Sequence, residues 1–298
     1  MAKANPLTTF LDLDDSLRDY STSDAVILPV PFERTTSYGR GTSHGPQAIL
    51  EASQQVELFD EELRSEPYKQ GIATLSPIED SGQPIRDYLD QLQQEVSSQL
   101  DSEKFVVSLG GEHTLTQAAV AAAAQTLGTI GVVQFDAHAD MRDTYEGDRF
   151  SHACVMRRVN DMGIPHLGVG IRSLSPAEAA YIETQGLEMV WGRDLDQLTP
   201  SRFRHLLEGL PAKIYLTFDV DFLDPALLPA TGTPEPGGGS WWPTLSLLRV
   251  LFETREVVAM DLVELAPIAG QATSDFTVAR LAYKCLAYHQ AWRSALPR

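Results

Sequence analysis

The sequence has few cysteines, only Cys154 and Cys285 in 298 residues. Two cysteines this far apart do not make a disulfide framework, so we expect a reducing compartment and a cytoplasmic protein. No apolar run approaches the ~18 residues that a membrane-spanning helix needs. Residues 1–11 also lack the cationic start and apolar core of a signal peptide. These absences argue against a secreted protein and against a membrane partner.

Basic residues are also scarce. Lys and Arg number 23 against 41 Asp and Glu, which gives a formal net charge of −18. Nucleic-acid binding needs a basic face, so this balance argues against a nucleic-acid partner. The negative charge would attract cations, including a cationic substrate. A solvated acidic surface is the simpler explanation of the charge, and no specific inference depends on it.

Apolar strands alternate with helical segments along the chain. Because the strands are almost continuously apolar, the pattern predicts an α/β protein with three layers, a mostly parallel sheet covered by helices on both faces. With no repeat or linker, we expect one domain over residues 24–298, preceded by a polar, loosely attached N-terminal arm over 1–23. Strands are predicted over 25–30, 105–109, 132–135, 165–171, 187–191, 214–218 and 257–260, and helices over 46–53, 84–100, 114–127, 177–186, 201–210 and 274–292.

Ionisable side chains follow three of these strands. In an extended chain alternate side chains point the same way, so every second residue after 132–135 can converge on one spot. Ligands of α/β proteins bind at the carboxyl ends of parallel strands, and unpaired buried charge is costly. These side chains therefore predict a site rather than a dry core. They are His113 after the first strand, Asp136, His138 and Asp140 after the second, and Asp219 and Asp221 after the third.

The number and type of these six residues indicate a pair of metal ions. One metal needs three or four protein ligands, and a carboxylate can bridge two cations. Two metals about 3.5–4 Å apart can share a water and lower its pKa toward neutrality. Ligands rich in carboxylate and free of thiolate favour Mn²⁺ over zinc. Each motif alone could instead be structural, since Asp-x-Asp is common in turns.

Taken together, these motifs resemble the ureohydrolase family, which contains agmatinases and arginases. The resemblance covers about residues 26–290 and implies an arginase-like fold with two Mn²⁺ ions per chain. One ion would be held by His113, Asp136, Asp140 and Asp219, and the other by Asp136, His138, Asp219 and Asp221, with Asp136 and Asp219 bridging. The matching stretches are 35–46, 110–113, 135–140, 151–152, 217–225, 231–234 and 261–267.

The resemblance also implies a reaction, hydrolysis of a guanidino group to urea and an amine. Glu264 would hold the guanidinium, Asp140 would pass a proton to the leaving amine, and His152 would exchange protons with solvent. From the residues alone, Glu264 could be a structural ion-pair partner and His152 a surface histidine. The family implies a homotrimer or a homohexamer.

The loop between Asp140 and His152 suggests the substrate. It lacks the asparagine and hydroxyl cluster that receives the α-carboxylate and α-amino groups in arginase-like enzymes. We therefore expect agmatine, hydrolysed to putrescine and urea. Arg142 and Arg149 leave 4-guanidinobutanoate open, and arginine and free guanidine also remain. A single-zinc amidase resembling deacetylases and a non-catalytic relative are alternatives from other classes.

Overall fold

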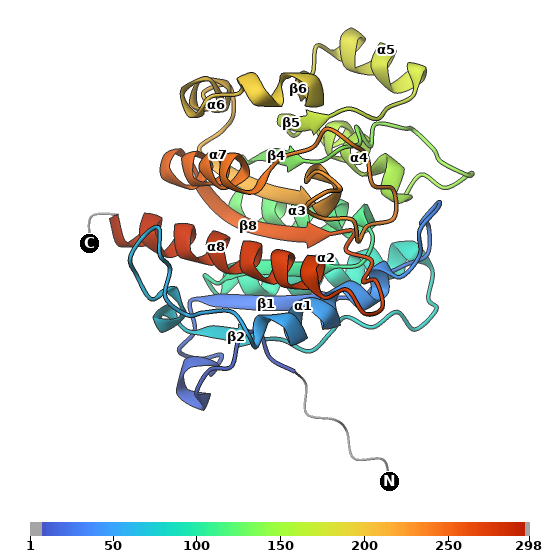
Figure 1. Ribbon diagram of the computed structural model, residues 1–298. Helices are drawn as coiled ribbons and strands as arrows, with labels where there is room; N and C mark the ends of the chain where they lie inside the picture. Colours follow the sequence, from blue (N-terminus) through green and yellow to red (C-terminus); the bar gives the residue numbers. More distant parts are fainter. Residues whose placement is uncertain (1–7, 296–298) are drawn as a thin grey trace.

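The structure, a computed structural model, describes residues 8–295 and contains one eight-stranded sheet in which every pair of neighbouring strands is parallel (Figure 1). The strand order is β2-β1-β3-β8-β7-β4-β5-β6. The strands are β1 (Ala25–Val30), β2 (Ile72–Thr74), β3 (Phe105–Gly110), β4 (Gly131–Phe135), β5 (His166–Ile171), β6 (Glu188–Trp191), β7 (Lys213–Asp219) and β8 (Glu256–Val263).

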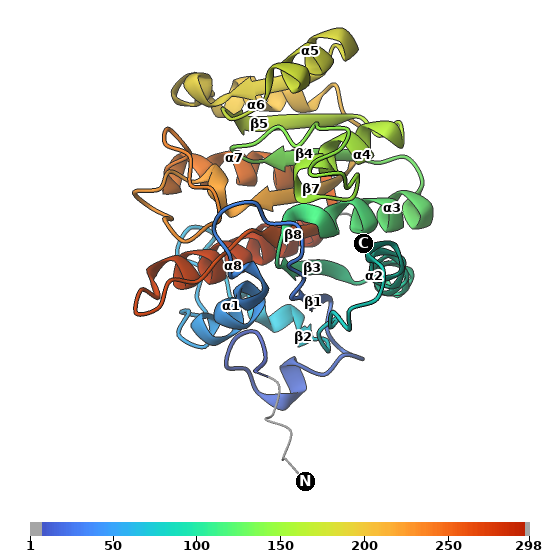
Figure 2. The ribbon, with the colours of Figure 1, turned by 90° about the vertical axis from the view of Figure 1, so that its right-hand side faces the viewer.

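Helices cover both faces of this sheet (Figure 2). In β1, Ala25 and Ile27 face one apolar cluster while Val26 and Leu28 face the other, as the two-residue period of a strand requires. The first cluster includes α1 (Gly45–Ser53), α6 (Pro200–Leu207), α7 (Trp241–Thr254) and α8 (Thr273–Ala295). The second includes α2 (Ile85–Asp101), α3 (Thr116–Leu127), α4 (Val155–Asp161) and α5 (Pro176–Gln185).

The predicted three-layer α/β architecture is confirmed, and so are all seven predicted strands and six predicted helices within a few residues at their ends. The strand predicted over 257–260 is longer, because β8 continues to Val263. Three elements were not predicted: β2, α4 and α7.

The expectation of a loosely attached N-terminal arm is wrong for its described part. Phe10 and Leu11 are fully buried in the cluster beneath α1 and α8. The amide of Phe10 donates to Thr74 Oγ1 at 2.8 Å, and that of Leu11 donates to Ser53 Oγ at 2.8 Å. Leu13 is buried in the same cluster, so apolar side chains within a polar stretch attach this segment to the core. Residues 1–7 of the arm, and residues 296–298 at the other end, lie outside the described residues.

The sheet brings together the strands that carry the predicted site. β3, β8, β7 and β4 are adjacent in the centre of the sheet, although they are far apart in the sequence. Gly111, just after β3, lets the backbone pass close to Phe32, because a Cβ at this position would lie 2.0 Å from the Phe32 carbonyl oxygen. Both cysteines are buried free thiols. No helix within residues 8–295 is long and apolar enough to cross a membrane.

Candidate active site

All six predicted ligands lie at the carboxyl end of the central strands. His113 begins a 3-10 turn just after β3, and the Asp136–Asp140 segment follows β4 directly. Asp219 is the last residue of β7, and Asp221 lies in the next turn. The structure therefore brings together residues up to 108 positions apart, and five of the six are buried.

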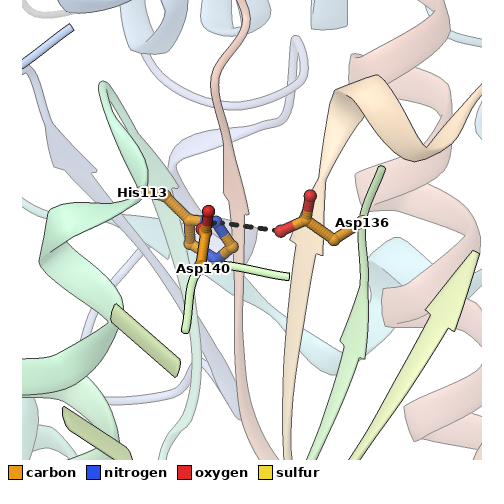
Figure 3. Close-up of side chains that lie close together, drawn as sticks. All are labelled: His113, Asp136 and Asp140. Atoms are coloured by element: carbon orange, nitrogen blue, oxygen red, sulfur yellow. Dashed lines mark ion pairs between the residues drawn. The ribbon is translucent and has the colours of Figure 1, made fainter. Parts of the chain in front are cut away.

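His113 lies at the centre of one half of the site (Figure 3). Its Nδ1 is 3.2 Å from Asp136 Oδ2, 3.1 Å from Asp140 Oδ2 and 3.4 Å from Asp219 Oδ2. This nitrogen is buried, and none of the described residues forms a well-directed hydrogen bond with it. The nitrogen and the three oxygens are instead spaced as ligand atoms that share one cation.

The other ring nitrogen of His113 fixes its tautomer. Nε2 is 2.8 Å from Thr217 Oγ1, and the Thr217 hydroxyl is 2.6 Å from Asp261 Oδ1. A carboxylate only accepts, so Thr217 donates its hydrogen to Asp261 and accepts the Nε2–H of His113. In the neutral ring the lone pair is then on Nδ1, facing the three carboxylates. Hydrogen bonds of this kind hold metal-binding histidines in the required orientation.

Asp136 also belongs to the second half of the site, with His138 and Asp221. His138 Nδ1 is 2.8 Å from Asp221 Oδ2 and 3.8 Å from Asp136 Oδ1. Ligand atoms of these three residues lie within 4.8 Å of one another, as do those of His113, Asp136 and Asp140. Asp136 is the member common to both groups. Asp219 is in neither group, although its Oδ2 contacts Nδ1 of His113.

The electrostatics of the site favour a cation. Burial and the carboxylates of Asp221 and Asp140 raise the pKa of Asp136 to about 7. Burial and the same kind of repulsion raise the pKa of Asp219 well above its usual value. Burial lowers the pKa of His113, but the surrounding carboxylates outweigh this effect and raise it. The site thus attracts positive charge, for which a proton and metal ions compete.

Two residues of the site have a left-handed backbone. The φ angle is 52° for Asp140 and 67° for Glu264. Residues other than glycine rarely adopt this region, and such conformations concentrate at functional sites. At Asp140 the backbone oxygen accepts from Arg157 N at 3.1 Å, and at Glu264 the amide donates to Gly111 O at 2.8 Å. These contacts hold both side chains at the cavity despite the unfavourable backbone.

Glu264 follows β8 and is buried beside the metal-type ligands. Its Oε1 accepts from the His113 amide at 2.6 Å. Burial and the nearby Glu112 raise the pKa of Glu264 well above its usual value. Its side chain lines the same cavity as His113, Asp219 and Asp221. A cationic group in this cavity would therefore stabilise the ionised form of Glu264.

The cavity has a volume of about 220 Å³, and five of the six predicted ligands line it: His113, His138, Asp140, Asp219 and Asp221. The loop residues Thr36 to Gly39 line one part of it, and Tyr145, His152 and Glu178 line another. The His152 ring lies edge-on to Tyr145, with ring centroids 5.8 Å apart. Its Nδ1 is 3.1 Å from Thr35 Oγ1. The structure thus places His152 in the wall of the cavity.

The two arginines of the substrate loop have different positions. Arg142 lines the cavity, with Nε 3.6 Å from Glu178 Oε2 and its guanidinium 5.2 Å from the centre of the Tyr145 ring. Arg149 is not among the residues that line this cavity, and its NH2 group lies 3.7 Å from Asp161 Oδ2. Only Arg142 is placed to meet a molecule in the cavity.

Comparison with known proteins agrees with this geometry. The sequence profile described as "Arginase family" matches residues 23–288. The chain belongs to the arginase family. It is 41% identical to the N(1)-aminopropylagmatine ureohydrolase of Synechocystis sp., over 92% of each chain, and 33% identical to the agmatinase of Pyrococcus horikoshii, over 91% of this chain and 94% of that one. The crystal structure of agmatine ureohydrolase of Thermoplasma volcanium superimposes with a TM-score of 0.85 at 28% identity, covering 93% and 94% of the two chains.

Membership in the arginase family assigns a reaction class. This ureohydrolase is a hydrolase that acts on the C–N bonds of amidines, and its family is a class of binuclear-metal enzymes. The two overlapping ligand groups, with Asp136 in both, provide a cluster in which metal can bind. The predicted resemblance to agmatinases is confirmed by the relatives of that name.

Sequence reasoning missed the residues that orient the ligands of this ureohydrolase. Gln134 Nε2 donates to Asp136 Oδ2 at 2.8 Å, and Thr217 and Asp261 fix His113 as described above. Gln134 and Thr217 are polar residues within apolar strands, and that contrast was a signal that could have been used. Asp261 is fully buried and accepts from the Thr217 hydroxyl.

Proposed function

We propose that this chain is a manganese-dependent ureohydrolase whose substrate is agmatine, which it hydrolyses to putrescine and urea. The observation that carries the proposal is the buried Nδ1 of His113, surrounded by three carboxylate oxygens at 3.1–3.4 Å. That donor set fits a divalent cation with oxygen and imidazole ligands. His113, Asp136, Asp140 and Asp219 would hold one ion, and Asp136, His138, Asp219 and Asp221 the other. Two manganese ions would supply an activated water as the nucleophile.

The chain's own residues would bind the substrate and move its protons. Glu264 would accept N–H groups of the guanidinium, which stays protonated at neutral pH because its pKa is above ~12. Asp140 would take the proton released by the attacking water and pass it to the leaving amine. His152 would then exchange protons between the cavity and solvent. This division of roles agrees with their positions, since Glu264 and Asp140 are buried and His152 is partly exposed.

The contacts of Arg142 support a substrate without a carboxylate. Its guanidinium already faces Glu178 and the Tyr145 ring. A guanidino acid would have to compete with Glu178 for this arginine, or leave its own carboxylate desolvated, which costs several kcal/mol. An amine tail would instead be attracted to Glu178, a carboxylate in the cavity wall whose oxygens also accept from the amides of Met141 and Ser175. These contacts support the proposal of a guanidino-alkylamine rather than 4-guanidinobutanoate or arginine.

A second candidate substrate is N(1)-aminopropylagmatine. It has the same guanidino head and a longer tail with a further amine, and a relative 41% identical over 92% of this chain is named for it. Its head would use Glu264 in the same way. The longer tail would extend past Glu178 toward the loop of Thr36 to Gly39, which carries the exposed Tyr38.

The test is urea release by the Mn²⁺-loaded protein from five compounds: agmatine, N(1)-aminopropylagmatine, 4-guanidinobutanoate, arginine and guanidine. We expect the highest kcat/KM for agmatine. Among the other four compounds, only N(1)-aminopropylagmatine also combines the guanidino head with an amine tail that has no carboxylate. Glu264→Gln should reduce turnover of every substrate, because all share the guanidinium. Preferred hydrolysis of arginine or guanidinobutanoate would refute the substrate assignment, and no urea from any compound would refute the proposed function.

The proposed assembly and location depend on the resemblance and composition alone. We propose a homotrimer or homohexamer in the cytoplasm, without nucleic-acid or membrane partners. Light scattering at micromolar concentration tests the assembly, and a monomer would contradict it.

A further inference from the structure

We propose that Thr35 is a positioning residue for His152. Its hydroxyl fixes the ring of His152 in the tautomer with hydrogen on Nδ1, which leaves Nε2 to exchange protons in the cavity. This inference rests on the proposed function, because it assigns a device to the histidine that was given the proton-exchange role there. It concerns a threonine that is 117 residues from His152 in the sequence.

Glu112, the residue just before His113, carries a fully buried carboxylate. Its Oε2 accepts from the amides of Arg34 and Thr35, both at 2.7 Å. Its Oε1 accepts from the hydroxyls of Thr35 at 2.7 Å and Thr114 at 2.6 Å. A carboxylate offers no hydrogen in return. The single hydroxyl hydrogen of Thr35 is therefore directed at Glu112.

The hydrogen bond from Thr35 to Glu112 determines how the Thr35 hydroxyl can bond to His152. Its Oγ1 is 3.1 Å from the backbone nitrogen of His152 and 3.1 Å from ring Nδ1. With its hydrogen used on Glu112, the hydroxyl can only accept from both groups. Nδ1 must then carry a hydrogen, and in the neutral ring the lone pair is on Nε2. The Ser151 hydroxyl, 3.3 Å from Nδ1, can rotate to accept as well and does not change this conclusion.

The same contacts connect the cavity-lining loop of Thr36 to Gly39 with the proton-exchanging histidine. Thr35 lies directly before Thr36, the first of the loop residues Thr36 to Gly39 that line the cavity, and His152 lines the same cavity. Within residues 8–295, every hydrogen bond of the His152 ring is made through Nδ1. Nε2 is thus the ring nitrogen left for the cavity. Loss of the Thr35 hydroxyl would let the ring adopt either tautomer, and a histidine in the wrong tautomer is a poor proton carrier.

A double-mutant cycle tests this proposal in the Mn²⁺-loaded full chain. Thr35→Val keeps the shape and removes the hydroxyl, while Glu112 retains three of its four donors. A positioned acid–base group typically contributes about 10²–10⁴-fold, and we expect Thr35→Val to lose only part of this, about tenfold in kcat, with KM little changed. Thr35→Ser should restore most of kcat. In the His152→Ala background, Thr35→Val should cause no further loss.

Thr114→Val is the matched control. It removes a hydroxyl from the same oxygen of Glu112 but leaves the contacts of His152 in place. Any loss that it causes should therefore persist undiminished in the His152→Ala background. Metal content and Tm should be measured for every variant, so that a folding defect is recognised. If Thr35→Val lowers kcat by the same factor with and without His152, Thr35 acts through the loop or Glu112, and the proposal is overturned.

A second readout does not need activity. Nitrogen-15 NMR of the histidine rings, with His152 identified by its loss in His152→Ala, reports which ring nitrogen is protonated. We expect hydrogen on Nδ1 in the wild type and a mixture of tautomers in Thr35→Val. Unchanged spectra in Thr35→Val would overturn the proposal, whether or not urea is released. Absence of urea from the wild type, with the expected spectra, would overturn the proposed function alone.

Discussion

Asp261→Asn should weaken metal binding although Asp261 touches no predicted ligand. Asp261 Oδ1 accepts from Thr217 at 2.6 Å, and Oδ2 accepts from Tyr215 and Thr116, both at 2.7 Å. Asparagine has nearly the same shape but replaces one acceptor with an N–H₂ donor. In either orientation of the amide, a donor then faces a hydroxyl that previously donated to the carboxylate.

The consequence for the metal depends on Thr217. When the NH₂ group of the new asparagine faces Thr217, the Thr217 hydroxyl can turn its hydrogen toward Nε2 of His113, which is 2.8 Å away. His113 would then carry its own hydrogen on Nδ1, the nitrogen that must bind metal. Changes in hydrogen bonds behind metal ligands typically cost about 10–100-fold in affinity. At 1.4 kcal/mol per factor of ten, this corresponds to about 1.4–2.8 kcal/mol.

Titration of the metal-free protein with Mn²⁺, followed by calorimetry, measures this change. We expect the Kd of one of the two ions to rise by about 10–100-fold, and kcat to recover at saturating Mn²⁺. Tyr215→Phe is the control, since it removes one donor from the other oxygen of Asp261 and leaves His113 with Thr217. Its Kd should change much less. Equal Kd values for the wild type and Asp261→Asn would refute the account of how His113 is oriented.

Three further predictions concern stability. Phe10→Ala should lower the free energy of unfolding by about 3–5 kcal/mol, because this side chain is fully buried; a loss below about 1 kcal/mol in chemical denaturation would show that the N-terminal segment is loosely attached after all. Gly111→Ala should destabilise the fold and lower metal content together, because its Cβ would lie 2.0 Å from the Phe32 carbonyl oxygen; normal Tm and metal content would contradict this. In the metal-free protein, the Tm of Asp136→Asn relative to that of the wild type should rise as pH increases from about 4 to about 7. The pKa of Asp136 is raised to about 7 in the folded state, so over this pH range the carboxyl ionises more readily in the unfolded chain and the wild type loses stability. A Tm difference that is independent of pH would contradict the repulsion inferred at Asp136.

The sequence was sufficient to predict the strands and the side chains at their ends. Strands such as β4 and β7 are mostly apolar and lead into an aspartate, so both the element and its polar end are local signals. The short strand β2 has three residues and offered too little pattern. The helix α7 was not predicted: it follows the Gly237–Gly239 run and begins with Trp-Trp-Pro, and glycine and proline are typical of loops.

Other features depend on partners distant in the sequence. Phe10 meets Thr74 across 64 residues, and Thr35 meets Glu112 and His152 across 77 and 117. Nothing near Phe10 or Thr35 distinguishes them from other residues in polar segments. The six predicted ligands could be named because each follows a strand, whereas the residues that orient them are identified only when the sheet brings those strands together.

The central claim is that this member of the arginase family uses two manganese ions per chain to release urea. The most direct measurement is a stepwise titration of the metal-free protein with Mn²⁺, in which bound metal and urea release from agmatine are recorded on the same samples. We predict that activity reaches its maximum at two ions per chain in the wild type, and that Asp219→Ala loses both metal and activity. Full activity at a single ion, or two ions still bound in Asp219→Ala, would contradict the account.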